Sequence, residues 1–222
     1  MAKRAHTKVD VVYGELKKAI LTGALEPGSL IDKTTVCEKL GVSRFPVSAA
    51  VSRLAYDKLV DVAPQQGSFV SRISINDVRE RLFIRSALEA EIAAEAALRM
   101  SREGRDALAE NLKEAKAAVE AGDRAMFYVS DVAFHHLLTA GLGMVRASEM
   151  LDGLRVHLER ARRLLMSPPG RILEVLHEHE AIAAAVQSGD ASAAREAMKR
   201  HLKVTGDLLA TVARQRPEMF SP

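Results

Sequence analysis

The chain has 222 residues, a net charge of +3 and 48% hydrophobic residues. This balance is ordinary for a globular protein of one large or two modest domains. No apolar run approaches the roughly 18 residues of a membrane span, and the first residues lack the apolar segment of a secretory signal. The single cysteine, Cys37, excludes an internal disulfide framework. Because unpaired cysteine is typical of a reducing compartment, we expect a cytoplasmic protein with no membrane partner.

The positive charge is concentrated in the first third of the chain. Residues 1–72 hold 11 basic and 7 acidic residues, a net charge of +4, whereas the remainder holds 21 and 22, a net charge of −1. This asymmetry favours a polyanionic partner for the N-terminal part.

Proline and glycine divide the first third into short elements, with Asp32 and Ser43 as expected N-caps and a tight turn at Gly41-Val42. In chain order we expect three helices and two strands: Val9–Leu21, Asp32–Leu40, Ser43–Lys58, Val60–Ala63 and Ser68–Ser71. Two short helices around a tight turn, followed by a hairpin, indicate a winged helix-turn-helix.

The rest of the chain is rich in Ala, Leu, Glu and Arg, which favour helices. Six helices are expected: Asn76–Met100, Glu103–Ala121, Arg124–Ala140, Val145–Met166, Arg171–Gln187 and Ala191–Arg214. Their short links favour an antiparallel six-helix bundle. The fold is therefore predicted to be mainly α, with a DNA-binding domain over residues 1–72 and an all-helical domain over residues 73–222.

The second helix of the predicted pair would present its first residues to base edges in the major groove. Arg44 can contact guanine through two hydrogen bonds, Phe45 can pack on a thymine methyl, and Ser43 and Ser48 can reach bases or phosphates. Arg53, further along, would meet phosphate. At the tip of the hairpin, Gln66 and Gly67 are candidates for the minor groove. The alternative is a helix-turn-helix scaffold that contacts protein instead of DNA.

Four polar residues lie on the apolar stripes of the C-terminal helices. Asp131 and His135 are four residues apart on one helix, so they share a face. His179 and His201 each lie among aliphatic residues of a different helix. Taken singly, such histidines are hydrogen-bonded core residues, and Asp131–His135 is an intrahelical pair. Taken together, they predict a metal site for Zn, Ni or Mn, because bundles build metal sites from ligands on facing helices.

Arg85 is a further charged residue on an apolar stripe. A buried guanidinium needs an anionic partner. That partner is either Glu89, four residues along the helix, or the carboxylate of a small-molecule effector, which arginine binds through two hydrogen bonds.

The N-terminal motifs resemble those of the GntR family of bacterial regulators. The resemblance covers residues 9–72 and rests on the runs Gly23–Gly28, Leu40–Val47 and Pro64–Val70. It implies DNA contacts at the reading helix, the wing and the first helix of the pair. Thr34, with Lys33 beside it, replaces the family's common arginine, Ser48 replaces an arginine, and Gln66 replaces a basic residue. The family's usual operator sequence is therefore not expected.

The C-terminal segment, over residues 76–214, resembles the FCD ligand-binding domain of the FadR subfamily, in its shorter, VanR-like form with six helices. The matching runs are Arg85–Glu89, Asp131–His135, Glu178–Ile182 and His201-Leu202. Metal-binding members hold the ion with an Asp-x-x-x-His pair and two later histidines. The resemblance implies these roles for Asp131, His135, His179 and His201.

Together these features predict a ligand-responsive transcriptional regulator, not an enzyme. We expect a homodimer on a palindromic operator, acting as a repressor that a small carboxylate metabolite, bound near a divalent metal ion, releases from DNA. Two alternatives remain open. The bundle is a metal-dependent enzyme attached to a DNA-binding domain, or the metal is purely structural and no small molecule binds.

Overall fold

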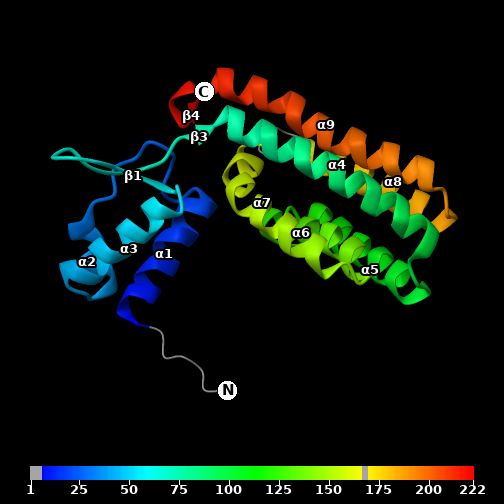
Figure 1. The fold of residues 1–222 in the computed structure, drawn as a ribbon, viewed down its shortest axis with the longest axis horizontal. Helices are drawn as coiled ribbons and strands as arrows, with labels where there is room; N and C mark the ends of the chain where they lie inside the picture. The colour runs from blue at the N-terminus through cyan, green and yellow to red at the C-terminus, as the bar shows by residue number, and fades with distance from the viewer. Residues whose placement is uncertain (1–6, 167–169) are drawn as a thin grey trace. The chain divides into compact units, whose positions relative to one another are not determined.

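A computed structural model describes residues 7–166 and 170–222. The chain divides into two compact units: the first is Met1–Ile75 with Ala213–Pro222, and the second is Asn76–Val212. We call these units the head and the bundle. Both are dominated by helices (Figure 1), so the expected mainly α fold is confirmed. Within the described residues, no helix is both long and apolar enough to cross a membrane.

The head begins with three helices, α1 (Lys8–Thr22), α2 (Lys33–Leu40) and α3 (Arg44–Tyr56). The Asp32 side chain caps α2 by accepting a hydrogen bond of 2.9 Å from the backbone N–H of Thr34. Gly41 ends α2 with a φ of +61°, in the left-handed region that favours glycine, and so makes the tight turn into α3. Helix α3 ends two residues before the expected Lys58, because Lys58 itself has a φ of +58°.

The wing is an antiparallel hairpin of β1 (Val60–Ala63) and β2 (Gly67–Val70). Residues 28–31 run along the other side of β2, where Ile31 N–H donates to Ser68 O at 2.8 Å. Gly67 has a φ of +129°, and a Cβ there would lie 2.8 Å from Leu30 Cδ1. Packing within the head, together with this φ, therefore requires glycine at position 67.

The head has its own apolar core between α1 and α3. The i, i+4, i+7 spacing of Val47, Val51 and Leu54 predicts that they point inward. Each is at most 1% exposed. They pack with the apolar stripe of α1, which includes Leu16 and Ile20. This core fixes the orientation of α3, and it leaves the opposite face of that helix exposed.

The last residues of the chain belong to the head, although the sequence analysis placed 73–222 in one domain. Strand β3 (Ile73–Ser74) pairs in parallel with β4 (Phe220–Ser221), which follows the 3-10 turn η1 (Pro217–Met219). Met219 and Phe220 are 3% and 6% exposed. These two apolar side chains and the β3–β4 pairing keep the terminal segment in the head.

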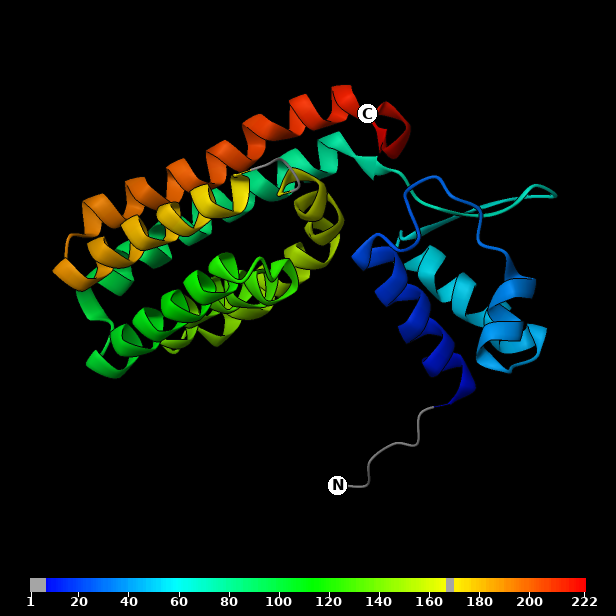
Figure 2. The same ribbon diagram turned by 180° about the vertical axis from the view of Figure 1, so that it is seen from behind.

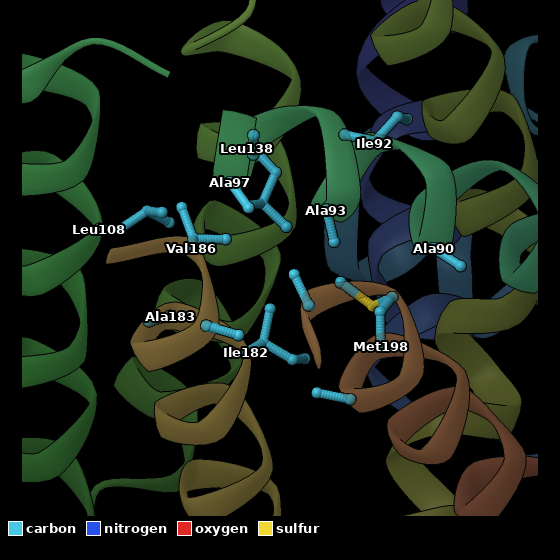
Figure 3. Packing of buried hydrophobic residues seen from close by; sticks show 14 of the residues in the cluster. Ala90, Ile92, Ala93, Ala97, Leu108, Leu138, Ile182, Ala183, Val186 and Met198 are labelled. Carbon is cyan, nitrogen blue, oxygen red and sulfur yellow. The ribbon is translucent and has the colours of Figure 1, made fainter. Parts of the chain in front are cut away.

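The bundle contains six helices: α4 (Ile75–Arg99), α5 (Arg102–Glu120), α6 (Arg124–Ala140), α7 (Val145–Leu165), α8 (Arg171–Ser188) and α9 (Ala191–Gln215). Their bounds lie within one residue of those expected. In Figures 1 and 2, α4, α8 and α9 form one layer and α5, α6 and α7 the other. Aliphatic side chains such as Leu138, Ile182 and Met198 fill the space between the layers (Figure 3).

Arg105 caps the end of the bundle at which helices α4 and α8 terminate. Arg105, in the first turns of α5, donates hydrogen bonds to Met100 O at 3.2 Å, to Ala97 O at 2.9 Å and to Val186 O. Helix C-termini leave their last carbonyls without partners within the helix. Arg105 therefore satisfies carbonyls of two helices at once.

We expect Arg105→Met to lower the free energy of unfolding by about 2–4 kcal/mol, because it removes charged hydrogen bonds that nothing else replaces. Urea denaturation followed by circular dichroism measures this loss. Arg102→Met is the matched control. Arg102 is 90% exposed, and its only ion pair among the described residues is a contact of 3.8 Å with Asp106. The control should change stability by less than about 0.5 kcal/mol. Equal effects of the two variants would contradict the capping role.

Candidate functional sites: an exposed reading helix and a buried histidine centre

The start of α3 presents the residues that the sequence analysis selected for base contacts. Ser43, Arg44, Phe45 and Ser48 are all exposed, and Phe45 is 78% exposed despite its large apolar ring. Ser43 is the N-cap of α3, but within the described residues its side chain makes no capping hydrogen bond. Its hydroxyl is therefore free for another partner. A helix held by its apolar face and exposed at its N-terminus has the geometry of a major-groove reading element.

The other DNA-contact candidates lie in different settings. Thr34, in the first turn of α2, and Gln66, at the wing tip, are exposed, and Lys33 is partly exposed. Gly67 lies at the start of β2, where the backbone and Leu30 explain it without DNA. Arg53 is half-exposed; it donates to Asp10 Oδ1 at 3.0 Å and lies 4.0 Å above the Tyr13 ring. A phosphate would have to compete with these contacts.

Three histidines from three helices converge inside the bundle. His135 comes from α6, His179 from α8 and His201 from α9, and each is less than 5% exposed. One potential ligand nitrogen from each lies within 4.8 Å of the other two. Phe134 stacks on the His179 ring, with 4.1 Å between centroids and 7° between planes, and so fixes its orientation. The sequence predicted these residues on one face of each helix, and the fold brings them together.

Two carboxylates lie against Nδ1 atoms of this histidine centre. Glu89 Oε2 on α4 lies 2.5 Å from His135 Nδ1, and Glu178 Oε2 accepts a hydrogen bond of 2.6 Å from His201 Nδ1. An imidazole whose Nδ1 is held by a carboxylate presents Nε2 as its free ligand atom. This pairing is the arrangement that orients histidines around a metal ion.

Asp131 joins the centre through one oxygen. Its Oδ1 lies 3.8 Å from His179 Nε2, whereas its Oδ2 accepts a hydrogen bond from Arg162 Nη1. His179 Nε2 is buried and has no hydrogen-bond partner among the described residues. A buried, unpaired imidazole nitrogen is costly unless a ligand satisfies it. The donor set of three imidazoles and one carboxylate fits a divalent ion.

The protonation states also suit a metal site. Burial lowers the pKa of His135 to about 4 and lowers the pKa of His179 well below its usual value, so both rings are neutral at pH 7. Burial alone would raise the pKa of Asp131, but Arg162 and the surrounding imidazoles hold it well below its usual value. Neutral imidazoles and an ionised carboxylate are the forms that bind metal.

Arg85 has the partner that its helical spacing suggested. Its Nε donates to Glu89 Oε1 at 2.6 Å, and both side chains are buried. Burial raises the pKa of Glu89, but Arg85 and the His135 ring outweigh that effect and hold the pKa well below its usual value. Arg85 therefore neutralises the carboxylate that holds His135, and it also lines the cavity beside the histidine centre.

A cavity opens beside the histidine centre, with a volume of about 510 Å³ including its open mouth. Its charged lining consists of Arg85, Arg162, Arg171 and Asp131, and His135 and His201 also line it. The remaining lining is apolar apart from Thr205. Each of the three arginines pairs with a carboxylate, which is Glu89 for Arg85, Asp131 for Arg162 and Glu178 for Arg171.

Sequence reasoning did not find Arg162, Arg171 or the role of Glu178. Arg171 binds Glu178 through two hydrogen bonds of 2.6 and 3.0 Å, and Glu178 in turn holds His201. Arg162 approaches Asp131 from a different helix. The pairs Arg162–Asp131 and Glu178–His201 join residues 31 and 23 positions apart, so helical spacing carries no signal of them, whereas Arg171 and Glu178 lie seven positions apart on α8.

Both parts of the chain match known families. Residues 8–70 match the family of bacterial regulatory proteins named gntR, and residues 80–204 match the FCD domain. The second match covers more than half of the chain. It also contains the histidine centre and the carboxylates that hold it.

Curated proteins and solved structures agree with these matches. The HTH-type transcriptional repressor RspR of Escherichia coli (strain K12) is 30% identical over 213 residues, which cover 95% of this chain and 92% of RspR. The HTH-type transcriptional regulator LutR of Bacillus subtilis (strain 168) is 27% identical, over 86% of this chain and 96% of LutR. The structure of E. coli McbR/YncC shares the fold, with a TM-score of 0.71 over 94% of this chain and 98% of that chain, at 24% identity.

The resemblance seen in the sequence motifs is therefore confirmed by matches that extend over almost the whole chain. The relatives are regulators rather than enzymes, and the head has the helix-turn-helix and wing that such regulators use on operator DNA. This protein belongs to the GntR family of bacterial regulatory proteins, in the group with an FCD domain, and it is a DNA-binding transcriptional regulator.

Proposed function

We propose that this protein is a ligand-controlled repressor whose bundle binds a small organic acid beside a divalent metal ion. The observation that carries the proposal is the convergence of His135, His179 and His201 next to a cavity with an excess of guanidinium groups. The similarity to RspR, which is named a repressor, supports repression. Because the target is operator DNA, we place the protein's action in the cytoplasm.

The metal ligands in this proposal are Asp131, His135, His179 and His201. His201 is held through Nδ1 by Glu178, His135 Nδ1 lies 2.5 Å from Glu89 Oε2, and His179 is stacked on Phe134. The donor types suit Zn, Ni or Mn. A bound ion would supply positive charge and open coordination positions for an oxygen ligand. Glu89 and Glu178 then orient the ligands without touching the ion.

The charges around the centre point to an acid as the effector. Three carboxylates around the centre each contact one arginine. The pairs are Asp131 with Arg162, Glu89 with Arg85, and Glu178 with Arg171. A divalent ion adds two positive charges to this balanced set. Uncompensated buried charge is unfavourable, and a carboxylate ligand would offset it.

On DNA, we propose a homodimer on a palindromic operator. A two-fold operator places two identical half-sites about one helical turn apart, and a two-fold dimer matches that symmetry. In each protomer the exposed start of α3 lies in the major groove, with Arg44 reading a base edge, and the wing lies nearby with Gln66 at its tip. The effector acts by favouring an arrangement of the protein that binds DNA less tightly.

The operator is first recovered by binding-site selection. We expect Arg44→Ala to lower the affinity for this operator about tenfold, because it removes a base contact made through two hydrogen bonds. Arg99→Ala is the control, since it removes the same charge from an exposed position in the bundle. Fluorescence anisotropy at one fixed salt concentration compares the two. If Arg44→Ala keeps both the affinity and the base preference of the wild type, α3 is not the reading helix.

We expect the purified protein to bind one divalent ion per chain, and His201→Ala to weaken that binding strongly. Elemental analysis after loading with Zn, Ni or Mn and removal of free ion measures the content. His177→Ala is the control, because His177 is exposed and lies on α8, two residues from His179. Metal content unchanged in His201→Ala, or no uptake by the wild type, would reject the ligand set.

We expect one or more small carboxylic acids to raise the thermal unfolding midpoint of the metal-loaded protein, since a ligand at 100 times its dissociation constant stabilises by about 2.7 kcal/mol. Arg85→Gln should lose this response, and Arg81→Gln, which removes the Asp77 partner on the same helix, should keep it. A metal-loaded protein that responds to no acid in a broad panel would indicate a purely structural ion.

A further inference from the structure

The guanidinium of Arg162 pairs with the carboxylate of Asp131, which the proposed metal site needs as a ligand. Arg162 on α7 donates from Nη1 to Asp131 Oδ2, and its side chain is 12% exposed while that of Asp131 is 5% exposed. Arg162 Nη2 lies 3.1 Å from Glu159 Oε2, one turn earlier on the same helix. Arg162 is thus held between a surface-side carboxylate on its own helix and the inner carboxylate of Asp131.

Arg162 holds Asp131 at the edge of the histidine centre. The nitrogens of His135, His179 and His201 form a group within 4.8 Å, and Asp131 does not belong to that group. Its nearer oxygen lies 3.8 Å from His179 Nε2. For Asp131 to bind an ion together with all three imidazoles, its carboxylate has to move toward the centre, and that movement weakens the contact between Oδ2 and Arg162.

Arg162 and a divalent ion also compete electrostatically. Both are positive, and two positive charges a few ångströms apart in a buried site repel strongly. Arg162 pairs with Asp131, and an oxygen of the same carboxylate lies 3.8 Å from His179 Nε2, so an ion bound at the centre would be a second cation beside that carboxylate. One carboxylate cannot compensate the guanidinium and the ion fully at the same time.

We propose that Arg162 is an internal counter-cation that neutralises Asp131 in the metal-free protein and is displaced from it when a divalent ion binds. This inference rests on the proposed metal site. The displaced side chain keeps its Glu159 partner and remains on the wall of the cavity, which it already lines with Arg85. Arg162 therefore lowers the affinity of the site for metal, the opposite of what a residue that merely supports the fold would do.

The test is a titration of Zn²⁺ into the metal-free full-length protein at one fixed pH, with the affinity measured by competition with a chromophoric chelator. Arg162→Gln should bind Zn²⁺ about tenfold more tightly than the wild type, a size typical of coupling between two sites. Arg163→Gln is the matched control, because Arg163 is the next residue, also pairs with Glu159 at 3.1 Å, and lies over the Tyr128 ring. The control should leave the affinity unchanged.

A double-mutant cycle then shows whether Arg162 acts through Asp131. In an Asp131→Asn background, the Arg162→Gln change should no longer tighten Zn²⁺ binding, because the carboxylate for which the two cations compete is absent. Arg162→Lys, whose circular dichroism should match that of the wild type, replaces Arg162→Gln if the latter does not fold. Its affinity should lie above that of the wild type, because an ammonium group lacks the planar fork of arginine.

The outcomes separate this inference from the proposed function. If neither the wild type nor any Arg162 variant binds Zn²⁺, Ni²⁺ or Mn²⁺, both the metal site and this inference are wrong. If the wild type binds metal and the Arg162 variants bind it equally or more weakly, the metal site stands and the counter-cation is overturned. The same conclusion follows if Arg162→Gln tightens binding by the same factor in the Asp131→Asn background.

Discussion

The structure of the bundle depends on the compensation of charge that is buried at its centre. Asp131, Glu89 and Glu178 reach the histidine centre, and each is held by an arginine as well as lying beside an imidazole. A buried carboxylate without such partners would take up a proton or destabilise the fold. Arg85–Glu89 lies within α4 and Arg171–Glu178 within α8, whereas Arg162–Asp131 joins α7 to α6.

Sequence patterns predicted the elements well because most of the determinants are local. Caps such as Asp32, left-handed glycines such as Gly41 and the apolar stripe of α3 depend on residues a few positions apart. The inward histidines were also visible, since each interrupts an apolar stripe. The ion pairs that complete the site could not be predicted, because Arg162–Asp131 and Glu178–His201 depend on how helices meet. The same reason explains why the return of residues 213–222 to the head was not foreseen.

Chain connectivity gives the centre a direct route to the head. Helix α4, which carries Arg85 and Glu89, follows β3, and helix α9, which carries His201, is followed by η1 and β4. Because β3 and β4 pair with each other, the two connections between bundle and head enter the head side by side. A ligand that changes the relative position of α4 and α9 would therefore act on both connections at once.

The central claim is that the three histidines hold a metal ion, with Asp131 as the fourth protein ligand. X-ray absorption spectroscopy at the metal edge of the loaded protein tests it most directly, because it reports the donor atoms around the ion. The account predicts a spectrum fitted by three imidazole nitrogens and oxygen donors, with one imidazole lost in His179→Ala. A spectrum with fewer than three imidazoles, or one that His179→Ala leaves unchanged, would contradict it.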